Sequence, residues 1–368
     1  MDLSVFGWDD EFEKCFQSFR ESGLSPARVV ESNRFIFNLM SESGLITGKL
    51  SVKFRKGLYN IADYPTVGDW VAYRYNDQTG YSSIHGMLGR RSKFSRKVKG
   101  KASQEQVIAA NIDTIFIVSG LDRDFSIRRL ERYTALAADS NAELVFILNK
   151  ADLCEDLQKV ISEVGGLFKG VPVYALSALN NKGIEQLLPH LKAGKTVVFI
   201  GSSGAGKSTI VNRLLGEERQ KTGPVSAHDG RGRHITTSKN LIVLPSGAIV
   251  IDTPGLREVQ LLCSVEGLKN AFSDIEEYAG ECKYRNCTHT DELGCAVLSA
   301  VNEGLIPEDR LKSYHKLKRE ISYNLSRRDE KSKNKRGKFW KNISKKSKLI
   351  QRSREIPPND SDFKVVYE

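Results

Sequence analysis

The chain has 368 residues, of which 40% are hydrophobic and 27% charged, a composition typical of a globular protein. This length is too great for one ordinary hydrophobic core, so two or three domains are expected. No run of about 18 apolar residues occurs, which excludes a conventional membrane-spanning helix. The opening residues, MDLSVFGWDDEFEK, are acidic where a signal peptide needs a basic and then an apolar segment, so we expect a cytoplasmic protein.

The net charge of +11 is concentrated at the C-terminal end. Residues 310 to 368 contain 19 Lys and Arg against 7 Asp and Glu, whereas the rest of the chain is close to neutral. A basic segment on a neutral body predicts a polyanionic partner, and RNA is favoured over a membrane because the segment lacks a sustained apolar face. A disordered tail that only keeps the protein in solution is the alternative.

A short helix is predicted near the start of the chain, followed by a small β-domain. Aromatic residues recur at helical spacing between residues 8 and 19, which indicates an amphipathic helix in an extension of residues 1 to 25. Residues 26 to 97 contain short β-like runs, such as RFIFNLM and DWVAYRY, separated by turn residues. Roughly five such strands in succession predict a Greek-key barrel of the OB type.

Basic residues follow the last of these runs closely. They are Arg90, Arg91, Lys93, Arg96, Lys97 and Lys99. Because OB barrels often bind nucleic acid, the cluster is either part of an RNA-binding surface or a linker whose charges are simply solvated.

Strands and helices alternate from about residue 107, and we assign residues 98 to 262 to one α/β domain. The apolar runs TIFIVSG, ELVFILNK, PVYAL, TVVFIGSS and AIVIDTPG each end in polar or glycine-rich residues. This alternation predicts a parallel sheet with helices on both faces, in which ligands bind at the carboxyl ends of the strands.

The segment GSSGAGKS matches the phosphate-binding pattern G-x4-G-K-[ST] and lies between a predicted strand and a predicted helix. Glycines permit the tight turn in which backbone N–H groups surround phosphates, and the helix N-terminus favours anions. We expect Lys207 to contact the β and γ phosphates and Ser208 to bind Mg²⁺. The loop residues expected at the site are Gly201, Ser202, Ser203, Gly204, Ala205, Gly206, Lys207, Ser208 and Thr209.

The tetrapeptide DTPG follows the apolar run AIVI. Asp252 is expected to bind Mg²⁺ through water, and the N–H of Gly255 is expected to contact the γ phosphate. The next residue is Leu256, where Ras-like enzymes place a glutamine that orients the attacking water. The usual helper of hydrolysis is missing from this position.

The sequence NKAD, from Asn149 to Asp152, ends a predicted strand and determines the expected base. Guanine offers two adjacent donors, N1–H and the 2-amino group, which the Asp152 carboxylate can accept together, whereas adenine lacks this pair. Asn149 and Lys150 belong to the same motif, and Ser177 and Ala178 of the sequence SAL would supply a backbone N–H to guanine O6. These motifs predict GTP and GDP as ligands.

The motifs occur in an unusual order. Ras-like GTPases have the phosphate loop first, whereas here NKAD and SAL precede GSSGAGKS, and DTPG comes last. Permutation is tolerated where the original termini are neighbours, because the same sheet can then form from a re-cut chain. We predict a circularly permuted P-loop GTPase domain of the α/β class.

A polar segment between Gly216 and Leu241 contains GRGRHITTSKN and is where the first switch region is expected. Thr236 is expected to bind Mg²⁺ when the γ phosphate is present. We hypothesise that His234 positions the attacking water as the catalytic residue, or that a partner completes the site, with slow intrinsic hydrolysis in either case. A solvated loop histidine is the alternative.

Cys282, Cys287, His289 and Cys295 form the pattern C-x4-C-x-H-x5-C. Three thiolates and one imidazole are a complete tetrahedral ligand set for one structural Zn²⁺ and leave no open position for catalysis. We assign residues 263 to 326 to a small α-helical zinc-binding domain and residues 327 to 368 to a basic, disordered tail. Disulfide pairing of some of these cysteines is the alternative, although no secretion signal supports it.

Together these motifs resemble one known family, the circularly permuted, ribosome small-subunit-dependent GTPases of bacteria called RsgA or YjeQ. The resemblance extends from about residue 26 to 325 and includes PTVGDWV, NIDTIFIVSGLDRDFSIRRLERY, NKADL, SAL, GSSGAGKST, GRGRH, DTPGLRE and the cysteine-histidine pattern. It implies an OB barrel, a permuted GTPase domain and a zinc domain. The implied role is to bind the 30S subunit and its 16S rRNA and to assist late maturation, with GTP hydrolysis coupled to release. We expect a monomer that does not bind membranes.

Two other functions are compatible with the same residues. The first is a permuted GTPase that acts on another RNA, such as the large ribosomal subunit. The second is a zinc-dependent RNA-binding adaptor that holds GTP without turnover, which the leucine at position 256 makes conceivable.

Deletion of residues 327 to 368 tests the role assigned to the basic tail. We expect weaker RNA association with a flatter salt dependence, because fewer counterions are released from phosphates, and unchanged nucleotide binding. Filter-binding titrations at several salt concentrations measure both quantities. An unchanged salt dependence would remove the case for RNA binding by the tail.

Overall fold

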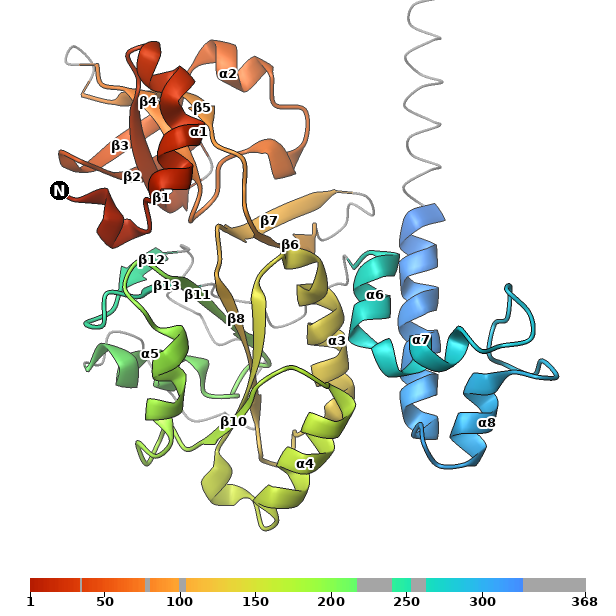
Figure 1. Ribbon diagram of the computed structural model, residues 1–368. Helices are drawn as coiled ribbons and strands as arrows, with labels where there is room; N and C mark the ends of the chain where they lie inside the picture. The colour runs from red at the N-terminus through yellow and green to blue at the C-terminus, as the bar shows by residue number, and fades with distance from the viewer. Residues whose placement is uncertain (34, 77–79, 99–103, 217–239, 253–262, 327–368) are drawn as a thin grey trace, which may run out of the picture.

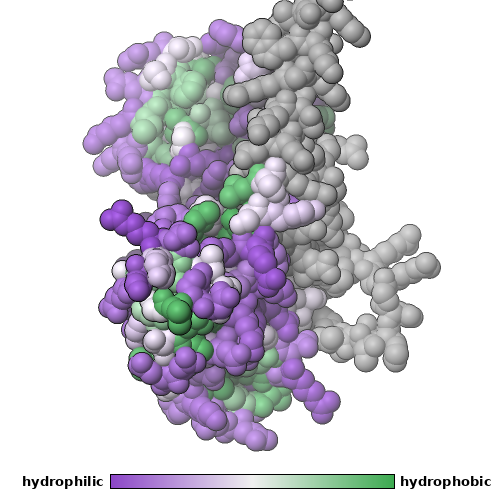
Figure 2. All heavy atoms as spheres, turned by 90° about the vertical axis from the view of Figure 1, so that its right-hand side faces the viewer, coloured by the Kyte–Doolittle hydropathy of each residue, from purple (hydrophilic) through white to green (hydrophobic). Residues whose placement is uncertain are grey.

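A β-barrel, an α/β region and a helical C-terminal region follow one another along the chain (Figure 1). The computed structural model describes residues 1–33, 35–76, 80–98, 104–216, 240–252 and 263–326. None of the helices in this described part is long and apolar enough to cross a membrane. The face of the molecule in Figure 2 is mainly hydrophilic, and its hydrophobic side chains lie in separate patches.

The N-terminal extension packs against the barrel through aromatic side chains. A 3-10 helix, η1 (Leu3–Phe6), precedes helix α1 (Asp10–Glu21), whose N-terminus is capped by the carboxylate of the preceding aspartate. Phe12 and Phe16 of α1 are buried against the barrel residue Trp70. The amphipathic helix predicted from the aromatic spacing is present, with its apolar face on the barrel.

Five strands close into a barrel, as the sequence predicted. They are β1 (Ser25–Asn33), β2 (Ile36–Ser41), β3 (Gly44–Leu50), β4 (Trp70–Arg74) and β5 (Ser82–Met87). β1 pairs with β2 and β4, and β5 pairs with β3 and β4, which closes the ring of hydrogen bonds. A register shift between Val29 and Glu31 bends β1. Helix α2 (Val52–Lys56) and the 3-10 helix η2 (Ile61–Asp63) connect β3 to β4.

A two-stranded ribbon joins the barrel to the α/β region and uses the basic residues that follow the barrel. β6 (Lys93–Lys97) pairs with β7 (Glu105–Ala110). Five basic side chains have partners within the molecule: Arg90 with Asp69, Arg91 with Asp9, Lys93 with Glu105, Arg96 with Gln106 and Lys97 with Asn324. Carboxylates bind Arg90, Arg91 and Lys93, whereas Arg96 and Lys97 bind neutral amide oxygens, so these side chains are not simply solvated as in a linker. Binding of RNA by this cluster stays a prediction. Lys99 lies outside the described residues.

The α/β region contains a central sheet of the predicted kind. Its strand order is β10-β9-β8-β11-β13-β12, and all neighbours are parallel except β13 and β12, which are antiparallel. The strands are β8 (Thr114–Gly120), β9 (Glu143–Asn149), β10 (Val173–Leu176), β11 (Thr196–Gly201), β12 (Asn240–Val243) and β13 (Ile249–Asp252). β12 also pairs with β1, so the barrel and the α/β region share one hydrogen-bonded sheet.

Helices cover both faces of this sheet. They are α3 (Ile127–Ala137), α4 (Leu157–Leu167) and α5 (Lys207–Leu215), with 3-10 helices η3 (Ala138–Ser140), η4 (Ala151–Leu153) and η5 (Ile184–His190). α3 and α4 pack against alternate strand residues such as Ile117 and Phe146, whereas α5 and η5 pack against Phe116 and Val145 on the other face. Burial on both sides explains why these strands are apolar runs rather than alternating patterns.

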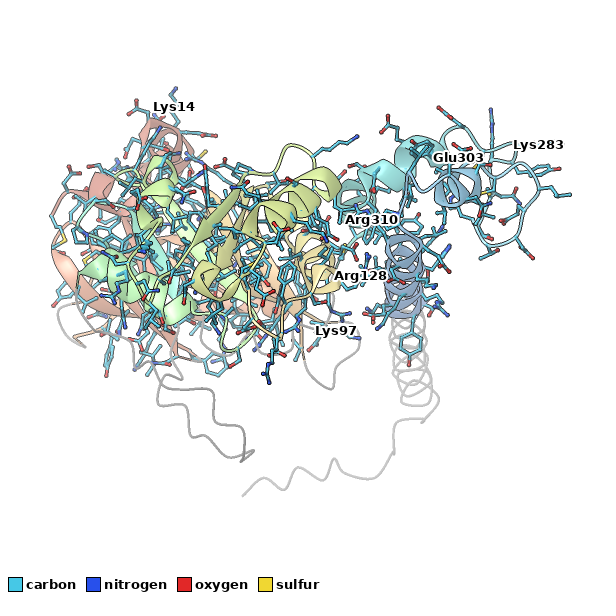
Figure 3. All side chains as sticks on the ribbon, turned by 90° about the horizontal axis from the view of Figure 1, so that it is seen from below. Lys14, Lys97, Arg128, Lys283, Glu303 and Arg310 are labelled. Atoms are coloured by element: carbon cyan, nitrogen blue, oxygen red, sulfur yellow. The ribbon has the colours of Figure 1, made fainter. Side chains whose placement is uncertain are left out.

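The helical C-terminal region is attached to α3 by buried charges. Its helices are α6 (Val265–Ala271), α7 (Ser273–Ala279), α8 (Ala296–Asn302) and a helix over residues 308–326. The buried Arg310 forms ion pairs with Asp274 at 2.6 Å and with Glu131 of α3 at 3.0 Å. Arg128 binds the same Glu131 carboxylate, and Figure 3 shows Arg128 and Arg310 together at this boundary.

Arg28 links the barrel to the α/β region and is only 1% exposed. Its guanidinium donates hydrogen bonds to Thr196 Oγ1 at 2.9 Å, to the carbonyls of Gly68 and Asn111 at 3.3 Å each, and to the carbonyl of Phe6. Burial lowers the pKa of Arg28 to about 10, so it remains charged at neutral pH. One side chain therefore connects the N-terminal extension, the barrel and the first residue of β11.

Substitution Arg28→Met is expected to lower the free energy of unfolding by about 3 kcal/mol, because buried carbonyls lose a charged donor. Urea denaturation followed by tryptophan fluorescence measures the change. The matched control is Arg20→Met, which removes an exposed ion pair with Glu13 and should cost less than about 1 kcal/mol. Equal stability of the two variants would contradict the linking role of Arg28.

Candidate nucleotide site and metal cluster

The phosphate loop lies between the end of β11 and the start of α5, as its sequence pattern predicts. Gly204 and Gly206 have φ angles of 81° and 93°, which favour glycine. A Cβ at Gly206 would lie 2.1 Å from Nδ2 of Asn149, so a larger residue would displace the asparagine of NKAD. Close packing thus ties the loop to the segment expected to bind the base.

Asn149 joins three motif segments. It is the last residue of β9 and is 3% exposed. Its Nδ2 donates to the carbonyl of Ala205 in the phosphate loop at 2.8 Å, and its Oδ1 accepts from the N–H of Ala178 in SAL at 3.0 Å. One buried amide therefore holds NKAD, SAL and GSSGAGKS together despite their permuted order.

The order of the strands explains why these segments meet. β10, β9, β8 and β11 are adjacent and parallel, so their carboxyl ends form one edge of the sheet. At this edge Ser177 is buried just after β10, whereas Asp152 in η4 is exposed. Arg213 of α5 supports SAL, because it donates to the carbonyls of Ala178 and Leu179 at 3.0 and 2.9 Å. The sequence alone did not identify Arg213.

Those residues expected to bind the phosphates and Mg²⁺ that the structure describes also lie at this edge. Nζ of Lys207 donates to the carbonyls of Gly201 and Ser202 at 2.9 and 2.6 Å. Asp252 ends β13, the neighbour of β11. Burial raises the pKa of Asp252, and the Lys207 ammonium opposes this rise. A partly buried carboxylate beside a phosphate loop fits a hard cation such as Mg²⁺. The loop and the first turn of α5 also contain Ser203, Ser208 and Thr209.

Lys150 of NKAD has a backbone φ of 63°, which is uncommon for a residue other than glycine. Its Nζ lies 2.5 Å from Oδ2 of Asp122, in the loop after β8. Asp122 was not among the site residues predicted from the sequence. A signal was available, because Asp122 follows the apolar run TIFIVSG in the same way that the other motifs follow their strands.

Three residues expected at the site, His234, Thr236 and Gly255, lie outside the described residues, as does Leu256. Their roles stay predictions. The remaining predicted nucleotide-site residues lie in the phosphate loop, in the segments after β9 and β10, and at the end of β13.

The four predicted metal ligands converge. One ligand atom from each of Cys282, Cys287, His289 and Cys295 lies within 4.8 Å of the others. Sγ of Cys282 is 3.9 Å from Sγ of Cys295 and 3.6 Å from Nδ1 of His289. Thiolates bound to a tetrahedral zinc at about 2.3 Å are about 3.8 Å apart, so the spacing fits Zn²⁺. The Sγ–Sγ distance between Cys282 and Cys295 is too long for a disulfide, and the cysteines are free.

The surroundings of His289 suit a metal ligand. It is 5% exposed, and burial lowers its pKa, which favours the neutral imidazole that binds metals. Its backbone carbonyl accepts a hydrogen bond from Nε2 of His315 at 3.1 Å, which connects the cluster to the helix over residues 308–326. The cluster is also close to α8, because Cys295 caps the N-terminus of that helix.

Comparison with known proteins points to one family. The model of the RsgA GTPase family matches residues 87–262. A protein of Opitutus terrae named small ribosomal subunit biogenesis GTPase RsgA is 45% identical over 338 residues, which cover 89% of this chain and 92% of that protein. A protein of Methanosarcina acetivorans with the same name is 42% identical over 320 residues, which cover 87% of this chain and 85% of that protein.

Solved structures agree with the fold. YjeQ from Thermotoga maritima has a TM-score of 0.60 at 29% identity, and the match covers 81% of this chain and 98% of that chain. YloQ, described as a circularly permuted GTPase, has a TM-score of 0.58 at 24% identity over 81% of this chain and 95% of that chain. The predicted fold, a barrel followed by a permuted GTPase domain and a cysteine-histidine cluster, is confirmed.

Substitution Cys295→Ser is expected to remove bound Zn²⁺ and to lower the thermal midpoint by at least about 5 °C, because a structural metal contributes to folding directly. Elemental analysis and a thermal scan measure the two effects. Cys15→Ser, which changes an exposed thiol outside the cluster, is the control and should retain the metal. Full zinc content in the Cys295 variant would refute the ligand assignment.

Proposed function

The chain belongs to the RsgA GTPase family, and we propose from this membership and from the geometry of the site that it hydrolyses GTP in the biogenesis of the small ribosomal subunit. The observation that carries the proposal is the pair of hydrogen bonds from Asn149. They join the segment expected to bind the base to the segment expected to bind phosphates. A single guanine nucleotide then spans both segments.

The base is read by the segments after β9 and β10. The Asp152 carboxylate is exposed and can accept the two adjacent donors of guanine. The aliphatic stem of Lys150 covers one face of the ring. Because the N–H of Ala178 already donates to Asn149, guanine O6 shares this donor or uses the next N–H of the SAL loop.

The phosphates and the metal ion are held at the other end. Lys207 exchanges its carbonyl partners, Gly201 and Ser202, for the β and γ phosphates when the nucleotide binds. The Ser208 hydroxyl and, through water, the Asp252 carboxylate would hold Mg²⁺, which would supply positive charge beside the phosphates. The position of the partly buried Asp252 at the end of β13, the neighbour of β11, supports this role.

The hydrolytic step involves residues outside the described part of the structure. We assign the positioning of the attacking water to His234, a Mg²⁺ contact to Thr236 and a γ-phosphate contact to the N–H of Gly255. Leu256 replaces the glutamine of Ras-like enzymes, so hydrolysis is slow until a partner completes the site. Completion by a partner contributes roughly 10³- to 10⁵-fold in known GTPases.

The barrel provides a surface for RNA of the small subunit. Phe35 is 53% exposed, the Arg55 guanidinium lies 5.1 Å from the centre of its ring, and the Tyr64 ring is 6.3 Å from it. Aromatic rings beside cations stack on unpaired bases and neutralise phosphates. We assign 16S rRNA as the RNA partner, with the protein acting as a monomer, because the relatives are named for the small subunit.

Phosphate release during multiple turnovers, with and without purified small subunits, tests the function. We expect slow release by the protein alone and an acceleration of at least about 10-fold with small subunits, because the partner completes the site. Lys207→Ala should abolish release under both conditions.

Two outcomes would contradict this function. Nucleotide binding without release, even with small subunits, would show an adaptor that holds GTP. Equal acceleration by purified large subunits would show a different ribosomal target.

A further inference from the structure

A carboxylate from the neighbouring strand holds Lys150 in place. Nζ of Lys150 lies 2.5 Å from Oδ2 of Asp122. A Cβ built on Gly120 would be 3.3 Å from Cδ and 3.4 Å from Cε of Lys150. The lysine stem therefore lies near the backbone at the end of β8, where a side chain on Gly120 would crowd this stem and also Oδ2 of Asp122, which is 3.3 Å from the same Cβ.

Asp122 is itself fixed by the backbone. Its Oδ1 accepts from the N–H of Asp124 at 3.1 Å. The N–H of Leu121 donates to the carbonyl of Asn149 at 2.7 Å, so the loop after β8 is joined to NKAD by backbone as well as by side chains. Both oxygens of the Asp122 carboxylate therefore have a partner.

The exposure of the pair argues against a role in stability alone. Lys150 and Asp122 are 26% and 29% exposed, and ion pairs of this kind contribute little to folding. The left-handed backbone of Lys150 costs energy, and such conformations concentrate at functional sites. Lys150 is also placed between Asn149, which reaches the phosphate loop, and Asp152, which is expected to read guanine.

We propose, on the basis of the function proposed above, that Asp122 is a positioning residue that holds the Lys150 stem as one wall of the guanine slot. The methylene groups of lysine pack readily against flat apolar surfaces while the ammonium group stays bound elsewhere. Without Asp122 the Lys150 ammonium group turns toward water, and the Lys150 stem no longer packs against the guanine ring. Because the wall contacts the base and not the phosphates, GDP and GTP lose affinity by the same factor.

Calorimetric titration of Asp122→Asn with GDP and with a non-hydrolysable GTP analogue measures this effect. We expect both dissociation constants to rise by about 5- to 10-fold, as for loss of one charge-assisted contact. Asp124→Asn is the matched control, because it removes the same charge from an exposed side chain two residues away and leaves the Lys150 contact intact. Its dissociation constants should equal those of the wild type.

A double-mutant cycle shows whether Asp122 acts through Lys150. In a Lys150→Met background, Asp122→Asn should cause no further loss of affinity, because the wall is then no longer held by charge. Gly120→Ala is a second way to displace the Lys150 stem, and it changes no charge. It should weaken both nucleotides by a similar factor, with no change in the thermal midpoint.

The outcomes separate this inference from the function on which it rests. Wild-type affinity in Asp122→Asn and Gly120→Ala overturns the inference and leaves the GTPase function intact. A loss that persists undiminished in the Lys150→Met background also overturns it, because Asp122 then acts elsewhere. A loss of affinity for the GTP analogue but not for GDP also overturns the inference. Failure of the wild-type protein to bind guanine nucleotides overturns both.

Discussion

The nucleotide site depends on the buried side-chain amide of Asn149. An amide offers a donor and an acceptor on one small group, and Asn149 uses the donor on the phosphate loop and the acceptor on SAL. Aspartate lacks the donor and leucine lacks both, and a buried group left without its partner costs about 1–3 kcal/mol. These two hydrogen bonds of Asn149 require that β9 lies near β10 and β11 in space. They do not depend on the order of the three strands along the chain. This is the physical reason why a permuted sequence retains the site.

Two buried arginines attach the flanking regions without obstructing that edge of the sheet. Arg28 reaches Thr196, the first residue of β11, which is at the opposite end of the strand from the phosphate loop. Arg310 binds Glu131 on α3, a helix that covers one face of the sheet. Their environments differ, since Arg28 has hydrogen bonds to neutral acceptors and Arg310 has two carboxylate partners. Both leave the carboxyl ends of the strands available to a nucleotide.

The sequence predicted those parts of the structure that local patterns determine. Turn-separated β runs indicated the barrel, and glycine-rich segments after apolar runs indicated the sheet and its ligand-binding edge. The cysteine-histidine spacing indicated the cluster that the structure brings together. Contacts between distant segments were not predictable in this way. Arg90 binds Asp69 and Lys97 binds Asn324, so a run of cations that looked free is internally paired. The antiparallel strand β12 was also missed, because its four residues, one polar and three apolar, carry no periodic signal.

The position of β8 accounts for the remaining contact that the sequence did not show. β8 lies between β9 and β11, so its final loop faces both the base segment and the phosphate loop. This loop contains Asp122 and leads directly into α3, which begins at Ile127 and carries Glu131 four residues later. Glu131 is the residue that Arg310 of the C-terminal helical region binds, so α3 connects the loop of Asp122 to that region. The segment expected to bind the base and the region with the cysteine-histidine cluster therefore both contact the chain between Asp122 and Glu131.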